Sequence, residues 1–131
     1  MCIRDRLAAG ALSIAALTIP PAVATEAGAG LLDWSFDYHN TPIPVAIWYP
    51  ADDPPVAIDA GPFTLQAATG SEPSPHKHPL VVVSHGTGGS SIAHHPLAEA
   101  LAHAGYLVAA LTHPGDNYQD RSLVALSLIH I

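Results

Sequence analysis

The stretch Leu80-Val-Val-Val-Ser-His-Gly-Thr-Gly-Gly89 decides how this chain folds, because it joins an apolar run to a glycine-rich loop. The apolar run is short, rich in β-branched residues and bounded by proline and glycine, which predicts a strand buried on both faces. Beyond the loop, apolar residues recur at helical spacing from Ile92 to Ala104, and Gly105 predicts the end of that helix. Tyr106–Leu111 then predicts a second buried strand.

A strand, a helix and a second strand of this size predict a βαβ crossover with parallel strands. Upstream, Trp34–Tyr38 and Ile43–Tyr49 predict a strand pair around a turn, and the prolines at 42 and 44 suit an edge strand. Residues 51–78 are rich in Pro, Gly, Asp and Ser, which predicts a long surface connection with one short strand near 63–66. We therefore expect an α/β fold with a mostly parallel sheet.

The two ends of the chain do not fit this pattern. Met1–Arg6 and Leu126–Ile131 resemble translations of the two complementary strands of a transposase adapter that is used to prepare sequencing libraries. We expect both segments to be adapter-derived scars, foreign to the natural protein. Residues 25–125 are then expected to be the amino-terminal portion of a single, truncated domain. The only cysteine, Cys2, falls in the first scar, so no disulfide or thiol nucleophile is expected elsewhere.

Residues 7–24 predict a secretory signal peptide. Leu7 to Ile19 is apolar and uncharged but too short to span a bilayer, and Ala22-Val-Ala24 forms an A-x-A cleavage site. An uncleaved membrane anchor or a buried helix is the alternative. We expect cleavage after Ala24, a secreted or periplasmic protein, and no stable membrane anchor after cleavage.

Charge and histidine spacing exclude several classes of function. The formal net charge is -7, with 4 basic and 11 acidic side chains, so no basic patch is available for nucleic acid or an anionic membrane surface. Histidines are numerous, but none has the spacing of a metal-binding motif, and solvated or capping roles are their ordinary interpretation. They include His76, His78, His94, His95, His103 and His113. No metal or cofactor is expected.

Four segments carry a resemblance to known proteins: Ile47–Ala51, Val81–Gly89, Leu97–Ala110 and His113–Asp116. They resemble the amino-terminal part of α/β-hydrolases, most closely the predicted dienelactone hydrolases and the platelet-activating-factor acetylhydrolases, with secreted cutinase-like polyesterases next. The resemblance implies a serine hydrolase that cleaves a carboxylic ester or lactone by a Ser-His-Asp mechanism without a cofactor. Its substrate would be a small-molecule, lipid or polyester ester, and the resemblance leaves the oligomeric state open.

The same resemblance implies roles for the residues of the glycine-rich loop. The backbone N–H of Thr87 would be one of two donors to the oxyanion, and Gly86, Gly88 and Gly89 would shape the loop. His85 would support this loop through its ring nitrogens rather than act as a base. In this superfamily the nucleophile, acid and histidine follow in that order, which places all three beyond Ala125. The fragment alone is therefore expected to be inactive.

Other interpretations of the loop stay open at this stage. Gly86-Thr-Gly88 before a helix resembles half of a dinucleotide fingerprint, although Ser91 stands where the third glycine would be. The loop could also be a plain glycine turn, or part of a noncatalytic binding protein on the same fold. Ser90 and Ser91 lie too far past the strand for a nucleophile elbow, so one of them is expected to cap the helix.

Overall fold

The computed structural model describes residues 28–127. The predicted signal peptide, the scar at 1–6 and the last four residues lie outside this range. The elements in chain order are β1 (Gly28–Tyr38), β2 (Thr41–Ala51), β3 (Val56–Ala60), β4 (Phe63–Ala67), β5 (Leu80–Ser84), α1 (His95–His103), β6 (Leu107–Leu111) and α2 (Val124–Ser127). Neither helix has the length and apolar character needed to cross a membrane.

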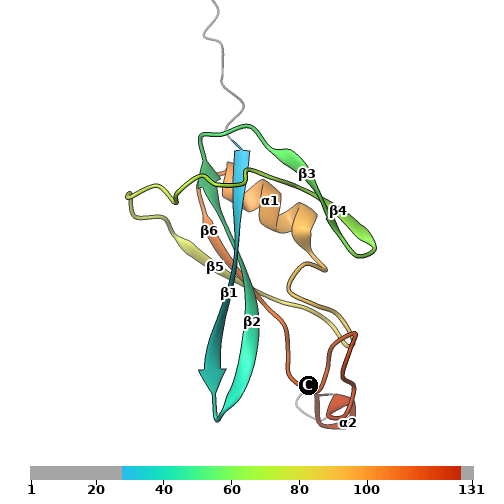
Figure 1. Ribbon diagram of the computed structural model, residues 1–131. Helices are drawn as coiled ribbons and strands as arrows, with labels where there is room; N and C mark the ends of the chain where they lie inside the picture. Colours follow the sequence, from blue (N-terminus) through green and yellow to red (C-terminus); the bar gives the residue numbers. More distant parts are fainter. Residues whose placement is uncertain (1–27, 128–131) are drawn as a thin grey trace, which may run out of the picture.

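Four strands form a mixed sheet in the order β1-β2-β6-β5, with α1 against it and the β3–β4 hairpin alongside the helix (Figure 1). The β1–β2 and β2–β6 pairs are antiparallel, whereas β5 and β6 run parallel and are joined through α1. The predicted βαβ unit with parallel strands is therefore confirmed. A mixed sheet with one packed helix is compatible with part of an α/β fold. The expectation of a mostly parallel sheet is not met within residues 28–127, because β1 and β2 pair antiparallel and β2 also runs antiparallel to β6.

The predicted strand pair is confirmed, and both strands are longer than the predicted segments Trp34–Tyr38 and Ile43–Tyr49. β1 and β2 pair along their whole length, from Gly28 opposite Ala51 to Tyr38 opposite Thr41. The expectation of an edge strand is wrong, because β2 also pairs with β6 along Val45–Trp48. The two prolines are tolerated because they precede this doubly paired stretch, where a missing N–H would remove a ladder hydrogen bond.

The core lies between the sheet and α1. Trp48 and Val108, from the central strands, are completely buried, and Ala98 and Ala102 form the buried stripe of the helix. Alanines on this stripe let the helix approach the sheet closely, so that a short helix covers parts of β1, β2 and β6. Small side chains on the helix thus leave room for the large indole of Trp48.

Residues 51–78 are more ordered than predicted, which corrects the expectation of a surface connection with one short strand. They form a two-stranded antiparallel hairpin, in which Val56 faces Ala67 and Ala60 faces Phe63. Leu65 and Ala67 point into the same core as Trp48. The alternation of apolar and polar residues along β4 explains this burial, because it gives the strand one apolar face.

Burial of β5 on both faces is also wrong. Leu80 and Val82 are each 59% exposed, whereas Val81 and Val83 pack against the core. Among the described residues β5 is the edge strand of the sheet, and α1 covers only the face to which Val81 and Val83 point. In β6 the burial also alternates, with Val108 and Ala110 buried and their neighbours half-buried.

The helix begins three residues later than predicted. Its N-cap is His94, which makes no side-chain capping bond, so the expected cap by Ser90 or Ser91 is wrong. Pro96 explains the start, because proline has no N–H and is favoured in the first turn. The predicted end is confirmed: the N–H groups of Gly105 and Tyr106 bond to carbonyls of the last turn, a Schellman motif.

Candidate functional site

Two loops meet where the parallel strands end. The glycine loop, residues 85–89, follows β5, and the second loop, residues 112–118, follows β6. Because Ser84 and Leu111 are opposite each other in the parallel register, both loops leave the sheet at the same level. Open sheets of this kind bind their ligands at the carboxyl ends of the strands. The structure therefore brings the two loops together at the end of the sheet where a ligand is expected.

The side chain of His85 joins the two loops. This residue is buried, with only 7% of its surface exposed. Its Nε2 accepts a hydrogen bond from the backbone N–H of His113 at 3.0 Å, so the ring proton lies on Nδ1. Nδ1 in turn donates to the carbonyl oxygen of Gly86 at 2.6 Å. Both ring nitrogens are thus committed to backbone groups, which leaves neither available to act as a base.

Gly86 to Gly89 form a tight turn. The N–H of Gly89 donates to the carbonyl of Gly86 at 3.1 Å, and Gly88 at the third position has a φ of 71°. Thr87 is not among the residues with positive φ, so the turn is of type II. A side chain at 88 would be strained, and a Cβ at 89 would lie 2.9 Å from the His85 ring. Gly86 has neither constraint, because nothing lies within 4 Å of its Cβ position.

The N–H groups of this turn differ in what they bind. The N–H of Gly88 donates to Asp116 Oδ1 at 2.9 Å, and that of Gly89 is used within the turn. Thr87 is exposed, and its N–H has no acceptor among residues 28–127. Among the backbone N–H groups of residues 87–89, only that of Thr87 therefore remains able to donate a hydrogen bond to an incoming oxygen atom.

Two further hydrogen bonds hold the glycine loop and the segment before the helix against the second loop. Thr112 Oγ1 accepts from the N–H of Ser91 at 2.8 Å, and the N–H of Tyr118 donates to the carbonyl of Gly89 at 3.2 Å. Thr112 is buried at the end of β6. These contacts attach the carboxyl-terminal side of the turn to the second loop.

Ser84 and His113 form a pair that the sequence analysis did not anticipate. Ser84 Oγ lies 2.7 Å from His113 Nε2. Burial lowers the pKa of His113, the nearby ring of His85 lowers it further, and Asp116 partly opposes this shift. His113 is therefore neutral at neutral pH. Ser84 ends an extended strand rather than occupying the strained strand-to-helix turn of a nucleophile elbow, so the contact resembles a nucleophile–base pair in distance only.

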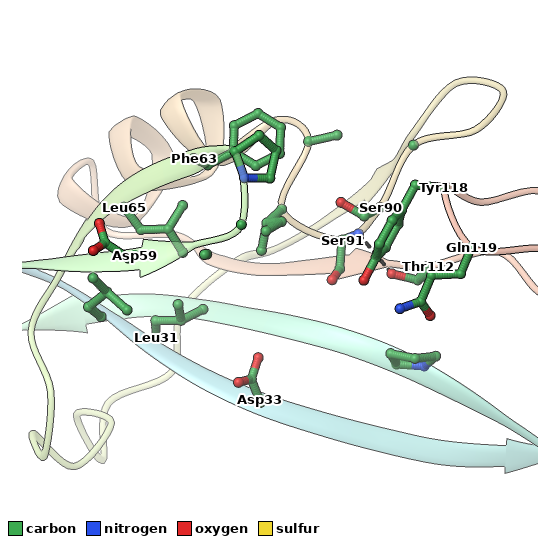
Figure 2. A pocket seen from close by; sticks show the side chains of 18 of the residues that line it. Leu31, Asp33, Asp59, Phe63, Leu65, Ser90, Ser91, Thr112, Tyr118 and Gln119 are labelled. Atoms are coloured by element: carbon green, nitrogen blue, oxygen red, sulfur yellow. Dashed lines mark hydrogen bonds between the residues drawn. The ribbon is translucent and has the colours of Figure 1, made fainter.

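A cavity of about 640 Å³ borders the glycine loop. Figure 2 shows it between the β3–β4 hairpin, the β1–β2 strands and the segment at 88–93, with Leu65 at one end and Tyr118 at the other. Its apolar lining includes Leu31, Ile58, Phe63, Leu65 and Ile92, and its polar lining includes Asp33, Asp59, Ser90, Ser91, Thr112, Tyr118 and Gln119. No Lys or Arg of the described part of the chain lines it. His113, which follows β6, does not line this cavity.

The histidines do not gather into a ligand set. Across residues 28–127, no group of three or more His, Cys, Asp or Glu side chains is placed to hold a metal ion. His95 instead contacts Glu99 at 3.0 Å, one helical turn away. The same Glu99 oxygen accepts from the N–H of Gln66, so this contact also ties the helix to β4.

Comparison with protein families gives one match, over residues 56–126, to the family described as platelet-activating factor acetylhydrolase, isoform II. The matched segment contains the β3–β4 hairpin, the glycine loop and the second loop, which supply most of the cavity lining; Leu31, Asp33 and Pro44 of the lining precede it. No curated protein matches the chain. The predicted resemblance to platelet-activating-factor acetylhydrolases is thus confirmed, and the family points to a hydrolase that acts on a small-molecule or lipid substrate. Because the match covers more than half of the 131 residues, this chain belongs to the platelet-activating factor acetylhydrolase, isoform II, family.

Proposed function

We propose that this chain is the amino-terminal part of a secreted or periplasmic serine hydrolase that cleaves a carboxylic ester or lactone. The Thr87 N–H supplies one of the two donors to the oxyanion. The second donor and the serine, acid and histidine of the triad belong to residues after 125 in the complete protein. The glycine loop is the half of the active site that this chain contributes.

The observation that carries the proposal is the unbonded Thr87 N–H on a loop that is otherwise held by hydrogen bonds. Attack on an ester makes a tetrahedral carbon with a negatively charged oxygen, and a donor held in place before the reaction stabilises that charge most effectively. The turn has this character, because Gly88 and Gly89 use their N–H groups to hold it while Thr87 remains exposed. A plain linking turn has no need for a buried carboxylate and a buried imidazole beside it.

The neighbouring cavity supports an ester with an apolar part. Its volume of about 640 Å³ is within the range of small-molecule sites. Asp33 and Asp59 lie in its lining without a described basic residue, which disfavours an anionic group there. We infer that the cavity takes an uncharged portion of the substrate, with the scissile carbonyl near Thr87.

The exposed sheet surface supports the proposal that the domain continues. Leu80 and Val82 of β5, with Trp34 of β1, present apolar side chains that are 59%, 59% and 55% exposed. The outer edge of β5 has no neighbouring strand within the described residues. Such an edge invites aggregation unless it is covered or paired. We expect residues 25–125 alone to be inactive and poorly stable.

The test begins with the source gene, read past the codon for Ala125 to its natural stop codon. We expect a G-x-S-x-G sequence followed by an acid and then a histidine. The complete protein is then purified and assayed with p-nitrophenyl acetate, with a variant in which the serine of that sequence is replaced by alanine as the control. Turnover that the control abolishes supports the proposal. An open frame without this serine, or a folded protein that binds esters without cleaving them, would contradict it in favour of a noncatalytic binding protein.

A further inference from the structure

Asp116 stands out among the groups that hold the glycine loop, because it is a carboxylate that is only 4% exposed. Its Oδ1 accepts the N–H of Gly88 at 2.9 Å, and its own backbone N–H contacts the carbonyl of His113 at 3.4 Å. A buried carboxylate is costly unless hydrogen bonds or charges compensate it. Its position next to a site that must stabilise negative charge therefore needs a specific reason.

The reason lies in the geometry of the turn. In a type II turn the central peptide, here between Thr87 and Gly88, has the opposite orientation to that in a type I turn. Gly88 permits both orientations, because glycine adopts positive and negative φ almost equally well. With its N–H toward Asp116, the central peptide is held by a charge-assisted hydrogen bond. In the other orientation the Thr87 carbonyl would replace this N–H and face a carboxylate.

One positively charged side chain lies beside the glycine-loop turn. The guanidinium of Arg121 lies against the turn, with Nη2 3.6 Å from the position that a Cβ on Gly88 would take. Arg121 is the only arginine within residues 28–127. The buried carboxylate can thus hold the turn while a neighbouring cation reduces its repulsion toward an oxyanion.

We propose that Asp116 is a positioning residue for the oxyanion loop: by accepting the Gly88 N–H it selects one orientation of the central peptide, which fixes the ψ angle of Thr87 and so holds the turn in the shape in which the preceding peptide presents the Thr87 N–H to the oxyanion. This inference rests on the proposed function. Asp116 does not touch the substrate. Its effect should appear in the stabilisation of the transition state and not in the binding of the substrate's ground state.

The test uses the complete protein with Asp116→Ala and Asp116→Asn, and Asp120→Asn as the matched control. Asp120 is exposed in the same part of the chain, and its carboxylate accepts from Ser122 and from the backbone N–H of Gly115 rather than from the glycine loop. We measure kcat and KM for p-nitrophenyl acetate, the Ki of phenylboronic acid as a tetrahedral analogue, and the thermal unfolding midpoint. Asp116→Ala should lower kcat and weaken boronate binding together by about 10²-fold, with KM within about two-fold.

Asp116→Asn should lose only about three-fold in kcat and in boronate affinity, because its neutral oxygen still accepts the Gly88 N–H, although more weakly. Asp120→Asn should match the wild-type protein. A folded Asp116→Ala variant with wild-type kcat and boronate affinity would overturn the inference, as would an asparagine variant as impaired as the alanine one. If the alanine variant does not fold, Asp116→Asn decides: parallel losses in kcat and boronate affinity support the inference, and unchanged values or a change in KM alone overturn it. An inactive wild-type protein would instead refute the proposed function.

Discussion

Two tight turns in this molecule both contain residues with positive φ, yet they are held in different ways. The turn between β1 and β2 places His39 and Asn40 at φ values of 49° and 62°, and strand pairing on both sides closes it. The glycine-loop turn has no hairpin around it and is held by Asp116, His85 and the backbone of Tyr118. A turn closed by its own strands needs no distant residues, whereas the glycine-loop turn, whose Thr87 N–H has no acceptor among residues 28–127, is held by residues of another loop.

The largest effect should come from removing that free N–H. In the complete protein, Thr87→Pro deletes the N–H, and proline suits the second position of a type II turn. We expect kcat to fall by about 10²- to 10³-fold with little change in the thermal midpoint. Thr87→Ala keeps the N–H and is the matched control, with activity within about three-fold of wild type. Equal activity of the proline and alanine variants would show that the reaction does not use the Thr87 N–H. The glycine-loop turn would then only connect two elements, as the hairpin turn does.

A smaller effect is expected where the second loop holds the segment before the helix. Thr112→Val keeps the side-chain shape but removes the oxygen that accepts the Ser91 N–H. The free energy of unfolding should fall by about 1 kcal/mol, because a partly buried donor loses its partner. Thr112→Ser, which retains the hydroxyl, is the comparison in a urea titration. The prediction fails if valine and serine variants unfold at the same urea concentration.

Acidification should destabilise the two-loop site through His113. Burial, and then the neighbouring His85, holds the pKa of His113 below 6.5 in the folded protein. The unfolded chain therefore binds this proton more readily, so stability falls as the pH falls below about 6.5 and levels off below the folded pKa. Unfolding free energies measured between about pH 8 and about pH 5 should show this slope, and His113→Asn should reduce it. An unchanged slope in the variant would assign the effect to other groups.

The smallest effect belongs to the hairpin turn. His39→Asn combined with Asn40→Gly introduces the sequence preferred by two-residue turns with positive φ at both positions. We expect about 0.5 kcal/mol of added stability and no change in kcat or in boronate affinity. A change in kcat or in boronate affinity would show that the hairpin turn affects the glycine-loop site. The two turns would then not be independent of each other. Thermal unfolding together with the p-nitrophenyl acetate assay measures both.

Local patterns in the sequence determined much of this protein. The strand pair, the parallel βαβ unit and the end of the helix at Gly105 all follow from periodicity and turn residues, which act over a few positions of the chain. The family resemblance followed from short runs such as Val81–Gly89, and the match over residues 56–126 confirms it. These properties depend on neighbours in sequence, so a single chain was enough to predict them.

Tertiary structure alone decided which residues meet. The edge position of β5 and the burial of Leu65 depend on which surfaces cover a strand, and periodicity within that strand does not show this. In the sequence, Asp116 appeared only as the last residue of the segment His113–Asp116 that carries part of the family resemblance, and no role was assigned to it. Its contact with Gly88, 28 positions away, follows from the parallel register of β5 and β6, which brings both strand ends to one level. Hydrogen bonds between loops on different strands depend on that register, and no local pattern determines it.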